Sequence, residues 1–455
     1  MAVRTLSYSM SEAAVDSKRF RATSEAAFRA LLLATSRGAG IAAQMGVQIA
    51  VGALAGPAGI GILQLHFAWG TLLGEVVGAG EPTRALRDHS IGYAQGRRRQ
   101  IARELTRSAL RIVLFALGLF LVTSTGWLLM KAVGSPTSAS TLLFSIMASA
   151  PLFALVRLAS ETLKAVERPL GAVALENAAM PGTILLFCAI FAAGWLRASP
   201  SNILLAAILG LLAALLGLLA TLLYALHKGD DRQTLEHTAP AHSRQFRPRS
   251  QWYFWLNGLL NIAFLQLPFL LLPWIASAEE IGRYAVAHKL VNVITTLLLL
   301  MAAVYGPRFA RAAAAADSVR LEQLLAQTQR VSMAVFLPTL AILCLCNNGL
   351  ASLFSLEAGT LLTLLLILGA GQLINAATGL SGVLLNMAGG EHLEMRLLVA
   401  ASAITALGTV PLARHFGVEG VAAAITLGIA ARNTAAYFLA KRHIESVSKL
   451  EEPSS

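Results

Sequence analysis

Long apolar stretches alternate with short polar ones along nearly the whole chain of 455 residues. The hydrocarbon core of a bilayer is about 30 Å thick, so a helix needs about 20 mostly apolar residues to cross it. Stretches of this kind recur through the sequence, separated by turns and loops that carry most of the charge. The pattern predicts twelve transmembrane helices, near residues 36–55, 61–80, 110–130, 138–160, 171–194, 203–226, 252–275, 284–305, 331–354, 360–387, 395–412 and 421–440.

The longest polar stretch in the middle of the chain is HKGDDRQTLEHTAPAHSRQFRPRS, residues 227–250. It divides the predicted helices into six and six. LAGPAGIG at 54–61 and IASAEEIG at 275–282 each join the first helix of a half to the second, at an offset of 221 residues. Because each half holds an even number of helices, two such repeats share one orientation in the membrane. An axis along the membrane normal then relates them.

The predicted fold is therefore an all-α polytopic membrane protein. Its twelve transmembrane helices form two six-helix bundles, related by a pseudo-two-fold axis along the membrane normal. Two such lobes enclose a cleft, and rocking of the lobes exposes that cleft to each side in turn. The predicted parts are an N-terminal cytoplasmic tail (1–35), an N lobe (36–226), a cytoplasmic loop between the lobes (227–250), a C lobe (251–442) and a C-terminal cytoplasmic tail (443–455).

Composition agrees with a membrane protein and gives it an orientation. Hydrophobic residues make up 56% of the chain and charged residues only 13%, and the mean hydropathy is +0.66. The net charge of +12 could indicate nucleic-acid binding. Here, however, the basic residues lie in short loops between apolar stretches, which fits the positive-inside rule better. Most of the 36 lysines and arginines fall on one side, so both termini are expected in the cytoplasm. The excess of Arg over Lys and the abundance of Ala suggest a bacterial inner membrane.

Several function classes are disfavoured by the sequence. A membrane glycosyltransferase or ligase needs a large extramembrane loop for its catalytic acids, and the predicted loops are short, so no enzyme is expected. The pattern G-x-x-x-x-G-K-[ST] of an ATP-binding loop does not occur. Cys188, Cys344 and Cys346 lie in apolar stretches without nearby ligand residues, which indicates packing and neither a metal site nor a disulfide. No cofactor is expected.

The segment AVAHKLVNVI, residues 285–294, places basic residues deep in a predicted span. Lys289 follows Glu280, expected at the outer surface, by nine residues, and at 1.5 Å per residue it lies roughly 13 Å deep. A charge at the centre of a membrane helix costs about 2.5–3.5 kcal/mol on insertion scales, so it needs a reason. The spacing places His288, Lys289, Asn292 and Thr296 on one helical face, which predicts a polar stripe facing another helix or a wet cleft.

Other polar residues extend this candidate site. Arg432 is expected as deep as Lys289, counted from the cytoplasmic side, and His66 nearly matches His288 under the 221-residue shift. Arg37 is expected at the inner mouth of the cleft. The candidate substrate-binding residues are therefore Arg37, His66, His288, Lys289, Asn292 and Arg432. Glu176, in a first-lobe span, is the candidate to carry a coupling proton, because burial can raise the pKa of a carboxyl group toward neutrality.

Two interpretations of the deep basic residues stay open. In the first, Lys289 and Arg432 line a cationic cleft that receives an anionic head group, since Lys and Arg are natural partners of phosphate. In the second, one of them pairs internally with Glu176 or with backbone carbonyls and holds the bundle together.

Three segments resemble a known family. SGVLLNMAGGEHLEMRL (381–397), HFGVEGVAAAITLG (415–428) and LAGPAGIG (54–61) are similar to segments of polysaccharide-type flippases. These belong to the multidrug/oligosaccharidyl-lipid/polysaccharide exporter superfamily. Ala55 stands where the family usually has a glycine, and the acids usual after the proline are absent. The resemblance implies two six-helix bundles and transbilayer movement of a lipid-linked sugar.

The expected function is thus that of a flippase for a polyprenyl-diphosphate-linked oligosaccharide in surface polysaccharide biosynthesis. The alternatives are a multidrug/cation exporter or a lipid II flippase of the same superfamily. Cation exporters should carry acids in the cleft, whereas the deep charges here are mainly basic. The expected partners are the lipid-linked sugar, membrane lipids and other polysaccharide assembly proteins, and not nucleic acid.

Overall fold

A computed structural model describes the backbone of residues 2–132, 140–227 and 249–451. Side-chain surroundings are described from Thr35 onward, apart from short stretches that include 126–132 and 294–300. Within these ranges the regular elements are all helices, and no strand occurs. The predicted all-α class is confirmed.

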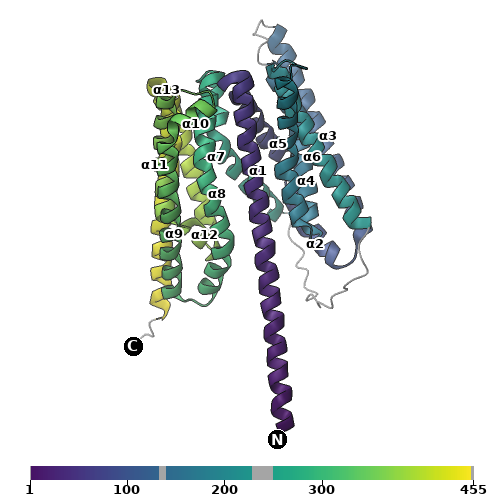
Figure 1. The fold of residues 1–455 in the computed structure, drawn as a ribbon, viewed down its shortest axis with the longest axis vertical. Coiled ribbons are helices and arrows are strands. Elements are labelled where there is room, and N and C mark those ends of the chain that lie inside the picture. Colours follow the sequence, from purple (N-terminus) through teal and green to yellow (C-terminus); the bar gives the residue numbers. More distant parts are fainter. Residues whose placement is uncertain (1, 133–139, 228–248, 452–455) are drawn as a thin grey trace.

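The N lobe is built from the first six helices. In chain order they are α1 (Ala2–Gly78), α2 (Glu81–Ala94), α3 (Arg98–Ala132), α4 (Ser140–Ala165), α5 (Pro169–Ala192) and α6 (Pro200–His227). Because α1 begins at Ala2, the stretch expected as an N-terminal tail continues the first helix in the structure (Figure 1).

The C lobe contains the remaining elements. They are α7 (Arg249–Leu271), the short 3₁₀ helix η2 (Leu272–Trp274), α8 (Ala278–Ala314), α9 (Ser318–Leu345), α10 (Asn347–Leu353), α11 (Ala358–Thr378), α12 (Ser381–Met387) and α13 (Glu391–Glu451).

The twelve predicted spans are all found in these helices. In the described part of the chain, eight helices are long and apolar enough to cross a membrane. Two of them contain a sharp break and hold two spans each: α1 breaks at Gly56 (φ 67°) and α13 at Gly417 (φ 57°). We call the parts of α1 its first arm (2–55) and its second arm (57–78). Helices α7 and α8 supply the remaining two spans.

Two predicted spans need a correction. The stretch 331–354 was expected to form a single helix, but the structure divides it at Cys346 into α9 and α10. The apolar stretch 360–387 was expected to form a single helix, but the structure divides it into α11 and α12 at Gly379 (φ 63°). A Cβ at this position would lie 2.8 Å from the Thr328 hydroxyl oxygen. A glycine therefore fits both the left-handed backbone and the close approach of α9. Hydrophobicity alone does not report such a break.

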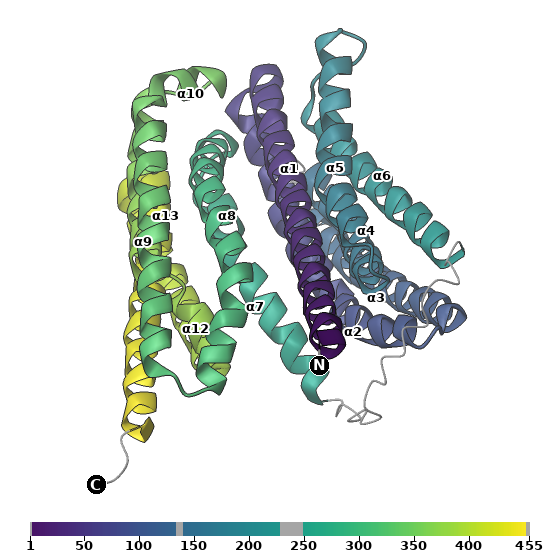
Figure 2. The same cartoon turned by 60° about the horizontal axis from the view of Figure 1, so that its bottom comes forward.

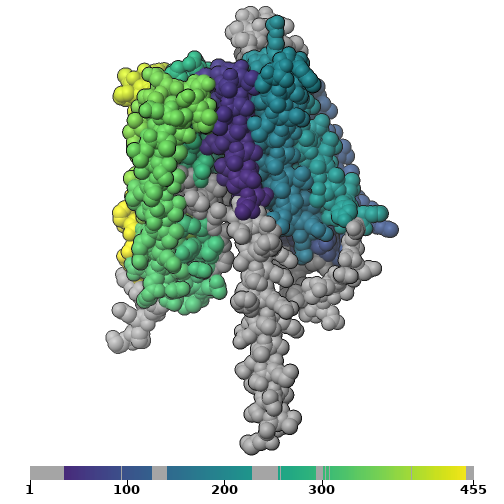
Figure 3. Space-filling model, viewed as in Figure 1, coloured from purple at the N-terminus to yellow at the C-terminus, as the bar shows by residue number. Residues whose placement is uncertain are grey.

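The two lobes lie side by side, and α1 of the N lobe packs against α8 of the C lobe between them (Figures 1 and 2). In the space-filling view, the surface of α1 lies between the surfaces of the lobes (Figure 3). One buried apolar cluster runs across both lobes and includes Val47 and Ile60 of α1 with Phe269 of α7 and Tyr284 of α8. Packing between the lobes is thus part of the main core.

The contact between the lobes is reciprocal at two glycines. A Cβ at Gly61 would lie less than 3.0 Å from the carbonyl oxygen of Ala278, and a Cβ at Gly282 less than 3.0 Å from that of Pro57. Gly61 and Gly282 are related by the 221-residue offset, and so are Pro57 and Ala278. Each residue thus makes the contact that its counterpart makes, as a two-fold axis between the lobes requires. We call this contact the glycine seal. The break in α1 and the start of α8, beside which these residues lie in sequence, are at the end of the molecule opposite both chain termini (Figure 1).

The helix α2 connects two spans at the same end of the molecule as the termini, and a buried histidine anchors it. His89 is 2% exposed, and its Nδ1 lies 3.1 Å from the Thr162 hydroxyl of α4. Burial lowers the pKa of His89, while the nearby Glu104 and Asp88 offset part of that effect. The imidazole is therefore neutral in the folded protein at neutral pH.

We expect acid to weaken the fold through His89. Below about pH 6.5, the ordinary histidine pKa, the unfolded chain binds a proton that the folded chain resists, so stability falls as pH falls. The melting temperature of wild type should drop more between pH 7.5 and pH 5.5 than that of His89→Gln. The exposed His392→Gln is the control and should behave as wild type does. Equal acid sensitivity of wild type and His89→Gln would contradict this assignment.

Candidate functional site

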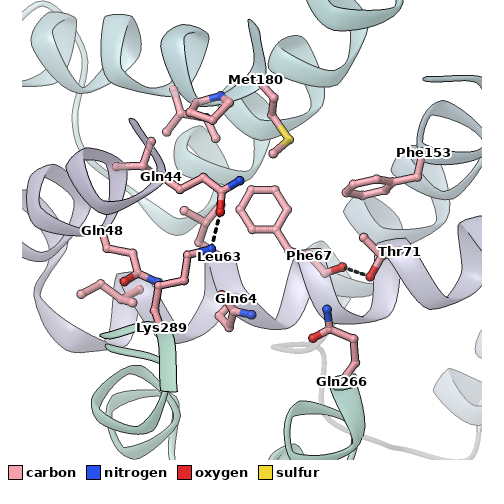
Figure 4. Close-up of a pocket in the computed structure, with 14 residues that line it drawn as sticks. Gln44, Gln48, Leu63, Gln64, Phe67, Thr71, Phe153, Met180, Gln266 and Lys289 are labelled. Atoms are coloured by element: carbon pink, nitrogen blue, oxygen red, sulfur yellow. Dashed lines mark hydrogen bonds between the residues drawn. The ribbon is translucent and has the colours of Figure 1, made fainter. Parts of the chain in front are cut away.

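A cavity of about 270 Å³ lies between the lobes, lined by side chains from both of them (Figure 4). Both arms of α1 line most of it, and α4 and α5 contribute Phe153, Met180, Pro181 and Ile184. The C lobe contributes Gln266 from α7 and Lys289 from α8. Both lobes therefore supply side chains to one space.

Lys289 is the only charged side chain among the described residues that line this cavity, and none of them is an acid. The start of α8 is fixed by a reciprocal cap: Glu280 N–H donates to the Ser277 hydroxyl at 3.3 Å, and Ser277 N–H donates to the Glu280 carboxylate at 2.8 Å. From there the helix carries Lys289 to the level of the cavity. Its ammonium group donates a hydrogen bond across the lobe interface to Oε1 of Gln44 on α1.

A lysine ammonium carries three donors. One of them is used on Gln44, a neutral amide. The positive charge is thus not matched by any described carboxylate in the cavity. The two remaining donors and the positive charge of Lys289 can bind an anionic group. The described lining has no carboxylate that could bind a cation.

Glutamine side chains and aromatic rings also line the cavity. Gln44, Gln48 and Gln64 project from α1 and Gln266 from α7. The rings of Phe67 and Phe153 meet edge to face, with centroids 6.4 Å apart. Gly70 and Gly74 allow this contact, because a Cβ at either position would lie less than 3.0 Å from Phe153.

A family model for polysaccharide biosynthesis proteins matches residues 29–313. The chain belongs to this family. No curated protein matches it.

The fold is shared with solved transporters. The inward-facing structure of a multidrug resistance MATE transporter of the MOP superfamily matches with a TM-score of 0.71 and 13% identity, covering 93% of this chain and 99% of that one. An outward-facing structure of such a transporter gives a TM-score of 0.60 at 15% identity, with coverage of 92% and 96%. A MOP superfamily transporter from Pyrococcus furiosus, described as having a binding pocket of reversed polarity, gives 0.60 at 16% identity with the same coverage. At these identities the similarity establishes the twelve-helix, two-lobe fold.

In this family member the predicted polar stripe on α8 divides between two places. Lys289 lines the inter-lobe cavity, whereas His288 and Asn292 line a separate pocket of about 50 Å³ inside the C lobe. His288 stacks on Tyr284, and the Asn292 amide lies 3.1 Å from its ring nitrogen. Consecutive residues on an α-helix point about 100° apart, so one neighbour faces the cavity while the other faces the lobe interior.

Arg432 is held inside the C lobe. Its guanidinium donates to Glu394 of the same helix, α13, and lies 5.9 Å from the centroid of the Phe264 ring. It does not line the inter-lobe cavity. His66 is fully buried in the N lobe, with its Nδ1 3.1 Å from the Ser145 hydroxyl.

The internal pairing considered for Glu176 differs in the structure. Glu176 accepts a hydrogen bond from the Ser160 hydroxyl at 2.7 Å, and one of its oxygens lies 3.6 Å from the Lys164 ammonium. It pairs with neither Lys289 nor Arg432. Arg37 is exposed on the first arm of α1 and does not line the cavity.

The four cavity glutamines were not part of the predicted site. Gln44 and Gln48 are four residues apart, so they share a helical face, and this spacing was the one available signal. Gln64 and Gln266 are isolated amides in apolar stretches, and only the folded arrangement brings them to the same space. Glu394, the partner of Arg432, lies in the predicted loop between the spans 360–387 and 395–412, where a charged residue is ordinary and does not mark a site.

We expect the Arg432–Glu394 pair to stabilise the C lobe. Glu394 is 9% exposed, so Glu394→Gln leaves a partly buried guanidinium without its counter-charge, which costs about 3–5 kcal/mol. The midpoint of thermal unfolding should fall clearly. Glu322→Gln is the matched control, because Glu322 pairs with Lys441 at 2.8 Å on the exposed surface, where a pair contributes about 0–1 kcal/mol. If Arg432→Leu/Glu394→Leu is no more stable than Glu394→Gln, the unpaired charge is not the cause.

Proposed function

We propose that this protein is a flippase. It moves a polyprenyl-diphosphate-linked oligosaccharide across the bacterial inner membrane by alternating access, for surface polysaccharide biosynthesis. Family membership and fold support a membrane transporter of the polysaccharide pathway. Movement of an intact lipid across a bilayer makes and breaks no covalent bond, so the proposed role is transport and not catalysis.

The observation that carries this proposal is the charge of the inter-lobe cavity. Lys289 is the one charged residue in its described lining, and its other polar groups are neutral amides and the Thr71 hydroxyl. A lipid diphosphate carries negative charge where Lys289 offers a positive one, and charge-assisted hydrogen bonds are the stronger kind. A cation exporter needs acids at this place. A MOP superfamily transporter from Pyrococcus furiosus is described as having a binding pocket whose reverse polarity suggests a different function, so pocket polarity can distinguish functions on this fold.

The position of the glycine seal indicates the side on which the cavity is closed. Segments that carry many basic residues, including the junction of α2 and α3 with Arg97 and the first residues of α3, lie at the end that holds both termini. By the positive-inside rule we assign that end to the cytoplasm. The seal then closes the cavity on the outer side. Opening it while the inner ends of the lobes approach would expose the same cavity to the opposite side.

Transport in proteoliposomes tests the function directly. One set receives a fluorescent polyprenyl-diphosphate sugar and a second set receives an organic cation, with protein-free liposomes as the control for spontaneous movement. Protein-dependent movement of the lipid-linked sugar alone is the expected result. Movement of the cation alone would overturn the proposal and make the basic residues structural.

A further inference from the structure

One buried oxygen in the cavity has no partner. Gln48 is only 6% exposed, and its Oε1 makes no hydrogen bond to any described group. The side chain lines the cavity on the first arm of α1 (Figure 4). A buried acceptor normally finds a donor, because leaving it unpaired costs the full desolvation of the group. A donor supplied by a ligand in the cavity would satisfy it.

The other glutamines of the cavity also fit a ligand that supplies hydrogen-bond donors. A glutamine side chain both donates and accepts, and so does a sugar hydroxyl or acetamido group. Gln64 and Gln266 reach the cavity from opposite lobes. The Gln44 side-chain oxygen accepts a hydrogen bond from Lys289, so its amide N–H groups can donate to a ligand. The rings of Phe67 and Phe153 add apolar surface against which the C–H face of a sugar ring can pack.

The charge balance excludes a second anionic group beside the phosphate. Lys289 is the single cation of the described lining, and the diphosphate would occupy it. A sugar carboxylate in the same space would be desolvated without a counter-charge, which is strongly unfavourable. The cavity of about 270 Å³ is also smaller than the roughly 300–1,000 Å³ of pockets that hold a drug-sized ligand. It can take one sugar ring, but not a whole oligosaccharide.

We propose that this cavity selects an uncharged sugar as the residue joined directly to the diphosphate. Gln48, with Gln64 and Gln266, hydrogen-bonds its hydroxyl or acetamido groups, while Lys289 binds the adjacent phosphate. The rest of the glycan stays outside the cavity. This inference rests on the proposed flippase function and adds the class of sugar that the protein recognises.

Binding of three lipids to the purified protein tests the inference. The probes are polyprenyl diphosphate without sugar, the same lipid carrying one N-acetylhexosamine, and the same lipid carrying one uronic acid. Wild type should bind the N-acetylhexosamine lipid at least about tenfold more tightly than the other two. Gln48→Met, which keeps the side-chain length, should lose that preference, because its affinity for the N-acetylhexosamine lipid falls to about that for the sugar-free lipid.

Two further variants keep the test decisive. Gln64→Leu should reduce the same preference, which guards against a folding defect peculiar to position 48. Gln372→Leu is the matched control: Gln372 is 8% exposed and lines the small C-lobe pocket instead, so the preference should persist.

The possible failures are distinguishable. If wild type binds all three lipids equally, or if Gln48→Met weakens all three equally, the sugar site is wrong while the flippase proposal stands. If none of the lipids binds but an organic cation does, the flippase proposal fails and takes this inference with it.

Discussion

Replacing Lys289 with leucine is expected to abolish transport of the lipid-linked sugar while the protein folds normally. A hydrogen bond to a charged group contributes about 1.5–3 kcal/mol, so losing the ammonium should weaken diphosphate binding by roughly 10- to 150-fold. The fold should not suffer, because the change removes a partly buried cation whose described partner is a neutral amide. An apolar side chain at this position no longer has a charge to desolvate inside a membrane span.

The measurement pairs transport in proteoliposomes with thermal unfolding of the same preparations. Lys441→Leu is the control for loss of one positive charge, because Lys441 pairs with Glu322 outside the cavity. Lys289→Arg keeps the charge and should retain part of the activity. Wild-type transport by Lys289→Leu would show that the lysine is structural or incidental, and the anionic-substrate argument would fall with it.

Much of the architecture could be predicted because membrane insertion imposes it on the sequence. Each span must be apolar over about 20 residues, so hydropathy predicts the twelve spans. Hydropathy does not predict the break at Gly379. The stretch stays apolar through the break, and what ends α11 is a left-handed backbone held close to Thr328 of α9. That contact depends on where a distant helix lies.

The candidate site could be predicted only at residues whose burial in a membrane span costs free energy. Lys289 was found because a charge in a span needs a reason, and it lines the cavity. The same energetic cost pointed to Arg432, but the structure shows that its charge is balanced by Glu394, 38 residues away in the sequence. His288 and Lys289 are neighbours in sequence yet face different spaces, because helix rotation is set by packing. Gln48, Gln64 and Gln266 are neutral, so no energetic penalty marked them in the sequence.

Replacing Gly61 with alanine is expected to shift the protein away from the sealed conformation. A Cβ at Gly61 would lie less than 3.0 Å from the backbone oxygen of Ala278, so the lobes must move apart at the seal. Overpacking of this kind typically costs about 1–3 kcal/mol. The cost falls only on the conformation in which the seal is closed, so the population ratio should move by roughly 5- to 150-fold toward the open seal. Gly282→Ala should act alike, because the two glycines exchange places under the pseudo-two-fold axis.

Labelling of a single cysteine reports this shift. In a background with Cys188, Cys344 and Cys346 replaced, a cysteine at Leu63 lies in the cavity close to the seal. A membrane-impermeant maleimide, added on the side opposite the termini, should label it faster in Gly61→Ala and in Gly282→Ala than in wild type. Gly118→Ala is the control, because a Cβ there meets nothing within 4 Å. The double variant should add little, since one methyl group already separates the backbones and the second no longer meets its obstacle. Unchanged labelling in both single variants would mean that the glycine contact is ordinary close packing and that the lobes open elsewhere.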